Sequence, residues 1–111
     1  MADPKVFEAM LARGQDNALL RYSLGNAYQA KSDFENAVKH LRAAIEHDPQ
    51  YSAAWKSLGR CYLDSGSFEE AIDCYRSGIT VAQNNGDKQA VKEMQVFLKR
   101  AERKAGKNSA E

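Results

Sequence analysis

One motif occurs twice in this chain at a spacing of 34 residues. When residues 18–51 are aligned with residues 52–85, nine positions carry the same amino acid in both copies. These positions are Ser23-Leu24-Gly25 with Ser57-Leu58-Gly59, Tyr28 with Tyr62, Phe34-Glu35 with Phe68-Glu69, Ala37 with Ala71, Arg42 with Arg76, and Ile45 with Ile79. Self-similarity at a fixed period of this length predicts a repeat fold, in which each copy is one unit that stacks on its neighbours.

Each copy contains two stretches in which apolar residues recur every third or fourth position, the pattern of one face of a helix. In the first copy these residues are Leu20, Leu24, Ala27 and Tyr28, followed by Phe34, Ala37, Val38, Leu41, Ala44 and Ile45. Polar turn sequences at residues 31–33 and 65–67 separate the two stretches. Ser67 and Glu70 predict a capping box, and Pro49 closes the first copy because it lacks the N–H of a continuing helix. Each copy is therefore predicted to be a helical hairpin.

Both copies also carry the residue signature of a known repeat. The second copy has Trp55, Leu58, Gly59, Tyr62 and Ala71, with Tyr75 in a place where Phe is usual. The first copy has Leu24, Gly25, Tyr28, Ala37, Ala44 and Pro49, with Leu41 in that Phe place. With these residues the chain closely resembles the tetratricopeptide repeat, whose unit has the same length. The resemblance implies an all-α fold of antiparallel helical hairpins, stacked as a short right-handed α-solenoid of about six helices.

Three positions depart from the family signature and one anchors it. Arg21 stands where Trp is usual, Gly78 where Ala is usual and Gln83 where Pro is usual. The family places Trp55 between the two helices of its unit, so we expect this side chain to be buried. Glycine is disfavoured inside a helix, so we expect Gly78 to permit a close approach of the last helix, helped by the small side chain of Ala90 or Ala101.

The segment before the repeats is interpreted as half of a further unit. Phe7 lies 34 residues before Leu41, so residues 3–14 are predicted to form the second helix of an incomplete copy. Asp3 can cap the first turn of this helix, and Gly14 can end it.

A basic segment follows the repeats and carries its own apolar stripe. The family ends its arrays with a half-polar helix of this kind, which covers the last apolar face. The tail is expected to fray. The predicted single domain 1–111 thus comprises a half-repeat helix (3–14), repeat 1 (18–51), repeat 2 (52–85), a capping helix (87–105) and a frayed tail (106–111).

Composition and spacing argue against several other classes of protein. A net charge of +1 gives no global attraction to nucleic acid or membrane, and no apolar run reaches the length of a membrane span. We expect a cytoplasmic protein in which Cys61 and Cys74 are reduced packing residues. His40 and His47 are interpreted as helix-surface residues, because about 10.5 Å along the axis is too far for one metal ion. No nucleophile with a matching base, no glycine-rich phosphate loop and no zinc spacing is present, so we predict a protein that is not an enzyme and has no cofactor.

The resemblance implies that the first helices of successive units line a concave face, where a peptide binds. The outward-facing candidates for peptide binding are Tyr22, Asn26, Gln29, Lys56, Arg60 and Leu63. An aromatic wall, an amide and two cations one helical turn apart suit an extended or helical peptide segment with an acidic or C-terminal carboxylate group. The predicted function is thus a non-catalytic protein–protein interaction module. The alternative is that this concave face is only solvated and binds no ligand.

The family's carboxylate clamp, which grips the C-terminal tails of heat-shock chaperones, is incomplete in this sequence. When the first copy is taken as the first unit of the clamp, Asn26 matches, but Tyr22 replaces its Lys and Ser57 replaces its second Asn. When the second copy is taken as the first unit, Lys56 matches but Arg60 replaces Asn.

Two other functions remain open. The incomplete first unit and the apolar stripe of the last helix could meet a second copy, which would make the chain a homodimeric or larger scaffold. The cations of the last helix could contact nucleic acid, although only Phe97 lies among them to stack a base, so nucleic acid is not expected.

Overall fold

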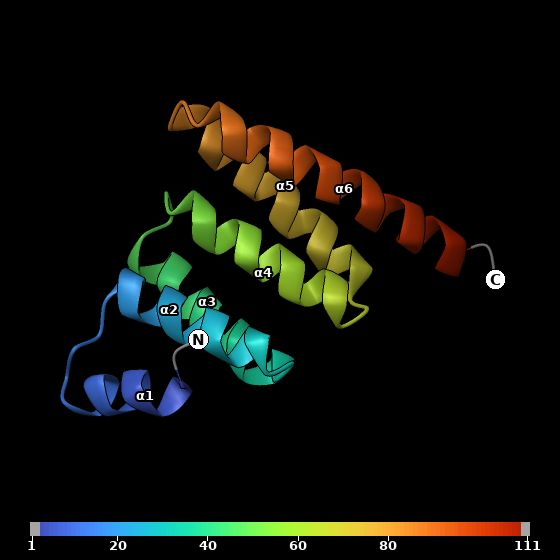
Figure 1. The fold of residues 1–111 in the computed structure, drawn as a ribbon. Coiled ribbons are helices and arrows are strands. Elements are labelled where there is room, and N and C mark those ends of the chain that lie inside the picture. Colours follow the sequence, from blue (N-terminus) through green and yellow to red (C-terminus); the bar gives the residue numbers. More distant parts are fainter. Residues whose placement is uncertain (1–2, 110–111) are drawn as a thin grey trace.

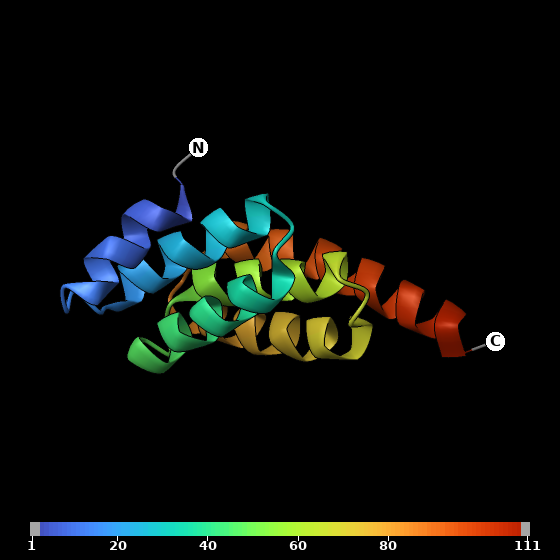
Figure 2. The ribbon, with the colours of Figure 1, turned by 90° about the horizontal axis from the view of Figure 1, so that it is seen from below.

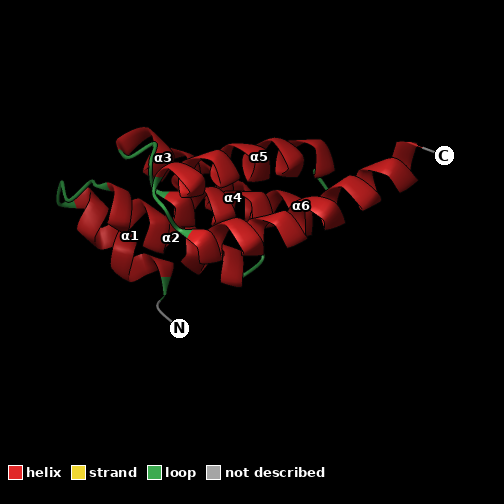
Figure 3. Cartoon of the chain, turned by 90° about the horizontal axis from the view of Figure 1, so that it is seen from above, coloured by secondary structure: helices red, strands yellow, loops and turns green. Residues whose placement is uncertain are grey.

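The computed structural model describes residues 3–109, with side chains up to residue 106. Within these residues it contains six α-helices and no strand (Figures 1 and 3). The helices are α1 (Pro4–Ala12), α2 (Ala18–Ala30), α3 (Phe34–His47), α4 (Ser52–Asp64), α5 (Phe68–Asn84) and α6 (Lys88–Ser109). The prediction of an all-α fold with six helices is confirmed.

The helices stack in chain order as two layers. Figure 1 shows α2 with α3, then α4 with α5, and finally α6 across the far end of the molecule. In the views from below and from above, α3 and α5 lie along one side, while α2, α4 and α6 lie along the other (Figures 2 and 3). The array measures 47 × 33 × 22 Å. Each hairpin therefore covers an apolar face of its neighbour that it could not bury alone.

Most helices begin at a side chain that accepts a hydrogen bond from their first turn. Asp3 accepts from the backbone N–H of Lys5, Asn17 from that of Leu20, Asp33 from that of Asn36 and Asp87 from that of Ala90, at 2.8–3.3 Å. The capping box predicted at Ser67 is wrong, since this side chain makes no cap hydrogen bond. The acidic residues Glu69 and Glu70 in the first turn of α5 instead complement its N-terminal dipole.

Turn residues end three helices as the sequence suggests, but the last helix is longer than the sequence predicts. Gly14, Gly66 and Gly86 take positive φ angles of 87°, 84° and 72° just after α1, α4 and α5, a conformation that glycine adopts without strain. Helix α6 runs to Ser109, past residue 105 where the sequence predicts the capping helix to end, and fraying of this last part stays a prediction. The same expectation for residues 110–111 lies outside the described residues.

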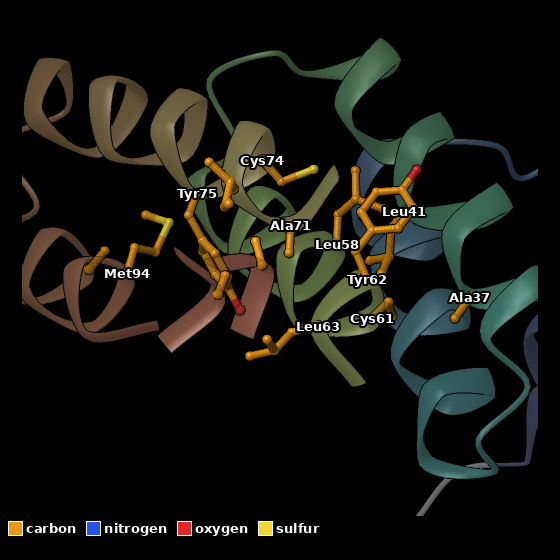
Figure 4. Packing of buried hydrophobic residues seen from close by; sticks show 14 of the residues in the cluster. Ala37, Leu41, Leu58, Cys61, Tyr62, Leu63, Ala71, Cys74, Tyr75 and Met94 are labelled. Carbon is orange, nitrogen blue, oxygen red and sulfur yellow. The ribbon is translucent and has the colours of Figure 1, made fainter. Parts of the chain in front are cut away.

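The repeated glycines explain how the two helices of each hairpin come together. A Cβ atom at Gly25 would lie 2.5 Å from Cγ of Leu41, and a Cβ atom at Gly59 would lie 2.7 Å from Cε1 of Tyr75. Leu41 and Tyr75 are themselves fully buried. The same close contact is thus made in both copies, and the core continues from it through α4 and α5 to α6 (Figure 4).

Gly78 lies against the last helix, as expected, but a different residue makes the contact. A Cβ atom at Gly78 would lie 2.6 Å from Sδ of Met94 on α6 and 2.9 Å from Cβ of Trp55 on α4. Neither Ala90 nor Ala101 is among its nearest neighbours. Trp55 is half-buried rather than buried, because its indole N–H reaches out to donate to the carbonyl oxygen of Pro49 at 3.0 Å.

Helix α1 makes the same kind of contact with α2 as α3 makes with α4. The hydroxyl of Tyr28 donates to Oε1 of Glu8 at 3.3 Å, and Nε of Arg42 donates to the hydroxyl of Tyr62 at 2.9 Å. Both members of each pair are 34 residues from their counterparts in the other pair. The first helix therefore contacts the array in the register of the repeat.

The expectation that His40 lies on the surface is wrong, since only 2% of this residue is exposed. Its ring stacks on Tyr28, with centroids 5.6 Å apart, while Nδ1 lies 3.0 Å from Nη1 of Arg21 and Nε2 lies 3.3 Å from Oε1 of Glu8. Desolvation on burial lowers the pKa of His40. Neutral His40 can therefore accept from Arg21 and donate to Glu8, so the unusual Arg21 has a structural role.

Candidate functional site

Two adjoining hollows lie on the face formed by α2, α4 and α6. The first, which we call the α2–α4 hollow, has a volume of about 520 Å³ and is lined by Phe7, Ser23, Asn26, Ala27, Gln29, Ala30, Arg60 and Asp64. The second, the α4–α6 hollow, has a volume of about 250 Å³ and is lined by Gln29, Lys56, Ser57, Arg60, Tyr75, Glu93 and Phe97. Gln29 and Arg60 belong to both, so the hollows form one continuous site.

Four of the six candidate binding residues line this site. Asn26 lies in the first hollow, Lys56 in the second, and Gln29 and Arg60 in both. Tyr22 lines neither hollow, because its ring packs on Tyr51 with centroids 5.0 Å apart. Whether these residues bind a peptide stays a proposal.

Leu63 does not face outward as expected, since only 6% of the residue is exposed. It belongs to the same buried cluster as Ala101 and Ala105 of α6. Both alanines lie within the capping helix that the sequence predicts over residues 87–105. Leu63 is therefore a core residue, not a ligand contact.

The two cations of the site already have acidic partners within the chain. Nζ of Lys56 lies 3.1 Å from Oε1 of Glu93, and Nε of Arg60 lies 3.1 and 3.2 Å from the two carboxylate oxygens of Asp64. The guanidinium of Arg60 also lies over the ring of Phe97, 5.2 Å from its centroid. Each of the two cations of the site is therefore already paired with a carboxylate of the chain.

Sequence reasoning missed several residues of the site. Asp64 follows Arg60 by one helical turn, so the four-residue spacing alone could have indicated this ion pair. Glu93 is 37 residues from Lys56, and no local pattern connects them. The guanidinium carbons of Arg60 and Arg100 both lie close to the ring of Phe97, 5.2 and 5.1 Å from its centroid. Two cations therefore contact this aromatic residue.

The two cysteines are buried, and the part of the chain that the structure describes contains no metal-binding cluster. Cys61 and Cys74 are buried free thiols, and burial raises their pKa values to about 12 and about 11, which keeps them protonated and unreactive. Within residues 3–109 no group of three or more His, Cys, Asp or Glu side chains could hold a metal ion. None of the described helices combines the length and apolar character needed to cross a membrane.

Comparison with known proteins agrees with this architecture. A tetratricopeptide-repeat model matches residues 22–87. The TPR repeat-containing protein PA0015 of Pseudomonas aeruginosa is 47% identical over 96 residues, which cover 86% of this chain and 91% of that protein. The solution structure of protein BPP2914 from Bordetella parapertussis has a TM-score of 0.81 at 48% identity, covering 93% of this chain and 90% of that chain. The TPR2B domain of yeast Sti1, solved as a complex with pHsp70, has a TM-score of 0.84 over 90% of this chain and 80% of that chain, and its 17% identity shows likeness of fold alone. The chain belongs to the tetratricopeptide-repeat family.

Proposed function

We propose that this chain is a non-catalytic protein-interaction module whose two hollows bind a peptide segment with an acidic group. One observation carries the proposal: Arg60 lines both hollows, so a single guanidinium can reach a ligand that lies across them. A guanidinium presents its N–H donors in a fixed fork that matches a carboxylate. The complex of the Sti1 domain with pHsp70 adds a precedent for a partner bound to this fold.

The lining of the site differs between its two ends. Ser23, Asn26 and Gln29 line the α2–α4 hollow with hydroxyl and amide groups, which both donate to and accept from peptide main chain. Lys56 and Arg60 place cations at the α4–α6 hollow. We therefore expect the acidic group of a ligand at the α4–α6 end and its neighbouring main chain along α2.

The internal ion pairs permit such binding because they are weak. About half of the Arg60 side chain and over a third of the Asp64 side chain are exposed. Pairs of this kind contribute about 0–1 kcal/mol. Asp64 accepts only from Nε of Arg60, so the terminal nitrogens of the guanidinium keep donors for an incoming carboxylate, which can also compete with this weak pair.

Fluorescence anisotropy with a panel of short fluorescein-labelled acidic peptides tests this function. Arg60→Glu should weaken every peptide that binds the native chain by about tenfold or more, because about 1.4 kcal/mol corresponds to a factor of ten. Lys99→Glu makes the same charge reversal at an exposed position on α6 that lines neither hollow, and it should change affinity by less than about twofold. Circular dichroism should show both variants folded. If no peptide binds at millimolar concentration, or if only Lys99→Glu weakens binding, the proposed function is wrong.

Self-assembly through the terminal helices has less support from the packing. Much of the apolar stripe of α6 is covered within the chain, since Ala90, Met94 and Ala101 are buried and Val91, Phe97 and Leu98 are partly buried against the core. Val6 on α1 and Val96 on α6 remain exposed, but single exposed apolar residues are ordinary on protein surfaces. Sedimentation should therefore give the mass of a monomer, and a stable dimer would favour assembly instead.

A further inference from the structure

Tyr75 brings a polar group to the α4–α6 hollow that the packing of the protein leaves without a partner. The residue is fully buried, and its ring borders the hollow beside Arg60 and Phe97. Its hydroxyl oxygen is buried and has no hydrogen-bond partner among the described residues. Buried polar groups in folded proteins nearly always have a partner, so this hydroxyl requires an explanation.

The ring of Tyr75 is held from both sides. Gly59 leaves room for it on α4, since a Cβ atom there would lie 2.7 Å from Cε1 and 2.8 Å from Cζ of the ring. On the other side Phe97 stacks on it, with centroids 5.9 Å apart and ring planes 13° from parallel. Figure 4 shows the ring extending from α5 toward Leu63, with the hydroxyl at its far end. The position of the hydroxyl is therefore fixed by packing.

Packing alone does not require this hydroxyl. In the first copy, the same position is Leu41, which is fully buried and makes the corresponding close contact with Gly25. An apolar side chain therefore fills this place without an unpaired polar atom. An unpaired buried hydroxyl destabilises the free protein, so a binding role is a better explanation of Tyr75 than a packing role.

We propose that the Tyr75 hydroxyl is a ligand-binding donor at the base of the α4–α6 hollow, and that it hydrogen-bonds a carboxylate oxygen of an acidic peptide. This inference rests on the proposed function and adds a specific residue to it. Arg60, bonded to Asp64 and lying over Phe97, borders the hollow beside Tyr75. When a peptide carboxylate replaces Asp64, Arg60 moves, and the two ligand oxygens accept from the guanidinium and from the phenol.

Tyr75→Phe tests this inference because it removes one oxygen atom and keeps the ring. The free variant should melt at the same temperature as the native chain or higher, since no hydrogen bond within the protein is lost. Its affinity for acidic peptides should fall by at least about tenfold, the effect of one hydrogen bond to a charged group. Peptides in which glutamine replaces glutamate should lose this sensitivity.

Tyr62→Phe is the matched control. This tyrosine accepts from Arg42 and lines neither hollow, so its loss should lower the melting temperature and leave peptide affinity unchanged. Peptides with a free or an amidated C-terminus distinguish a terminal carboxylate from a side-chain carboxylate. If peptides bind, and Arg60→Glu weakens them while Tyr75→Phe does not, the role of Tyr75 is refuted and the proposed function stands. If no acidic peptide binds the native chain, the proposed function and the role of Tyr75 are both refuted.

Discussion

Replacing Gly78 with alanine should change the stability of the protein through two opposing effects, helix propensity and packing. Alanine is favoured over glycine inside a helix by about 1 kcal/mol, so a position with free space would become more stable. At Gly78 the new Cβ atom would lie 2.6 Å from Sδ of Met94 and 2.9 Å from Cβ of Trp55, both well inside van der Waals contact. The packing of α5 between α4 and α6 should therefore oppose the gain.

The two neighbours differ in how far they can move. Met94 has a flexible side chain, but it is fully buried and has little room to turn. The Cβ atom of Trp55 is attached to the backbone of α4, so it can retreat only if that helix shifts. Overpacking of this kind costs about 1–3 kcal/mol. After the gain in propensity, we expect Gly78→Ala to destabilise the protein by about 1 kcal/mol and to lower the melting temperature by roughly 4 °C.

Gly106→Ala is the matched control, because Gly106 also lies within a helix but a Cβ atom added there would meet no other atom within 4 Å. It should stabilise the protein by up to about 1 kcal/mol. Urea unfolding followed by circular dichroism measures both changes. In a double-mutant cycle, Met94→Ala should reduce the cost of Gly78→Ala, because it removes the sulfur that the new methyl group meets. Equal stabilisation by Gly78→Ala and Gly106→Ala would refute the close approach of α6.

Three further outcomes are expected. Trp55→Ala should destabilise the protein by about 2–3 kcal/mol, less than a fully buried aromatic, and a loss below about 1 kcal/mol in urea unfolding would contradict its contact with the core. Because burial lowers the pKa of His40, the unfolded chain binds its proton more readily, and stability should fall as the pH drops below about 6.5. His40→Gln should flatten this fall in urea titrations, and an unchanged fall in that variant would contradict the reasoning. Asp64→Asn should tighten the binding of acidic peptides in anisotropy assays, because it leaves Arg60 without its internal carboxylate. Unchanged affinity would show that Asp64 and the peptide carboxylate do not compete for Arg60.

The sequence predicts the fold well because the repeat and its glycines act through local geometry. A helical period, turn residues and an N-terminal cap are each contained in a few consecutive residues, and the structure has the helices where these signals place them. The contact of Gly25 with Leu41 recurs between Gly59 and Tyr75 because both pairs lie in the same register. Packing that recurs with the repeat can therefore be inferred from one copy for the other.

What the sequence could not predict depends on neighbours that are distant along the chain. His40 has the spacing of a surface residue, and it is buried only because Glu8 of α1 and Arg21 of α2 meet it there. Leu63 is buried in the same cluster as Ala101 and Ala105 of α6, which are about 40 residues away along the chain. Lys56 of α4 pairs with Glu93, which lies on α6. Each of these outcomes requires the placement of a second element, which no local pattern supplies.

The two copies share the glycines at which their helices pack, but they differ at one position that lines the hollows. Gly25 and Gly59 are identical and serve the same contact, whereas Asn26 in the first copy corresponds to Arg60 in the second. If the hollows were only a solvated face, cations would be interchangeable with amides there, and exchanging the two residues would have no effect on binding. We expect the opposite for the double variant Asn26→Arg with Arg60→Asn. It keeps the composition and net charge of the chain, but it moves the guanidinium away from the Tyr75 hydroxyl, so acidic peptides should bind it about as weakly as they bind Arg60→Glu.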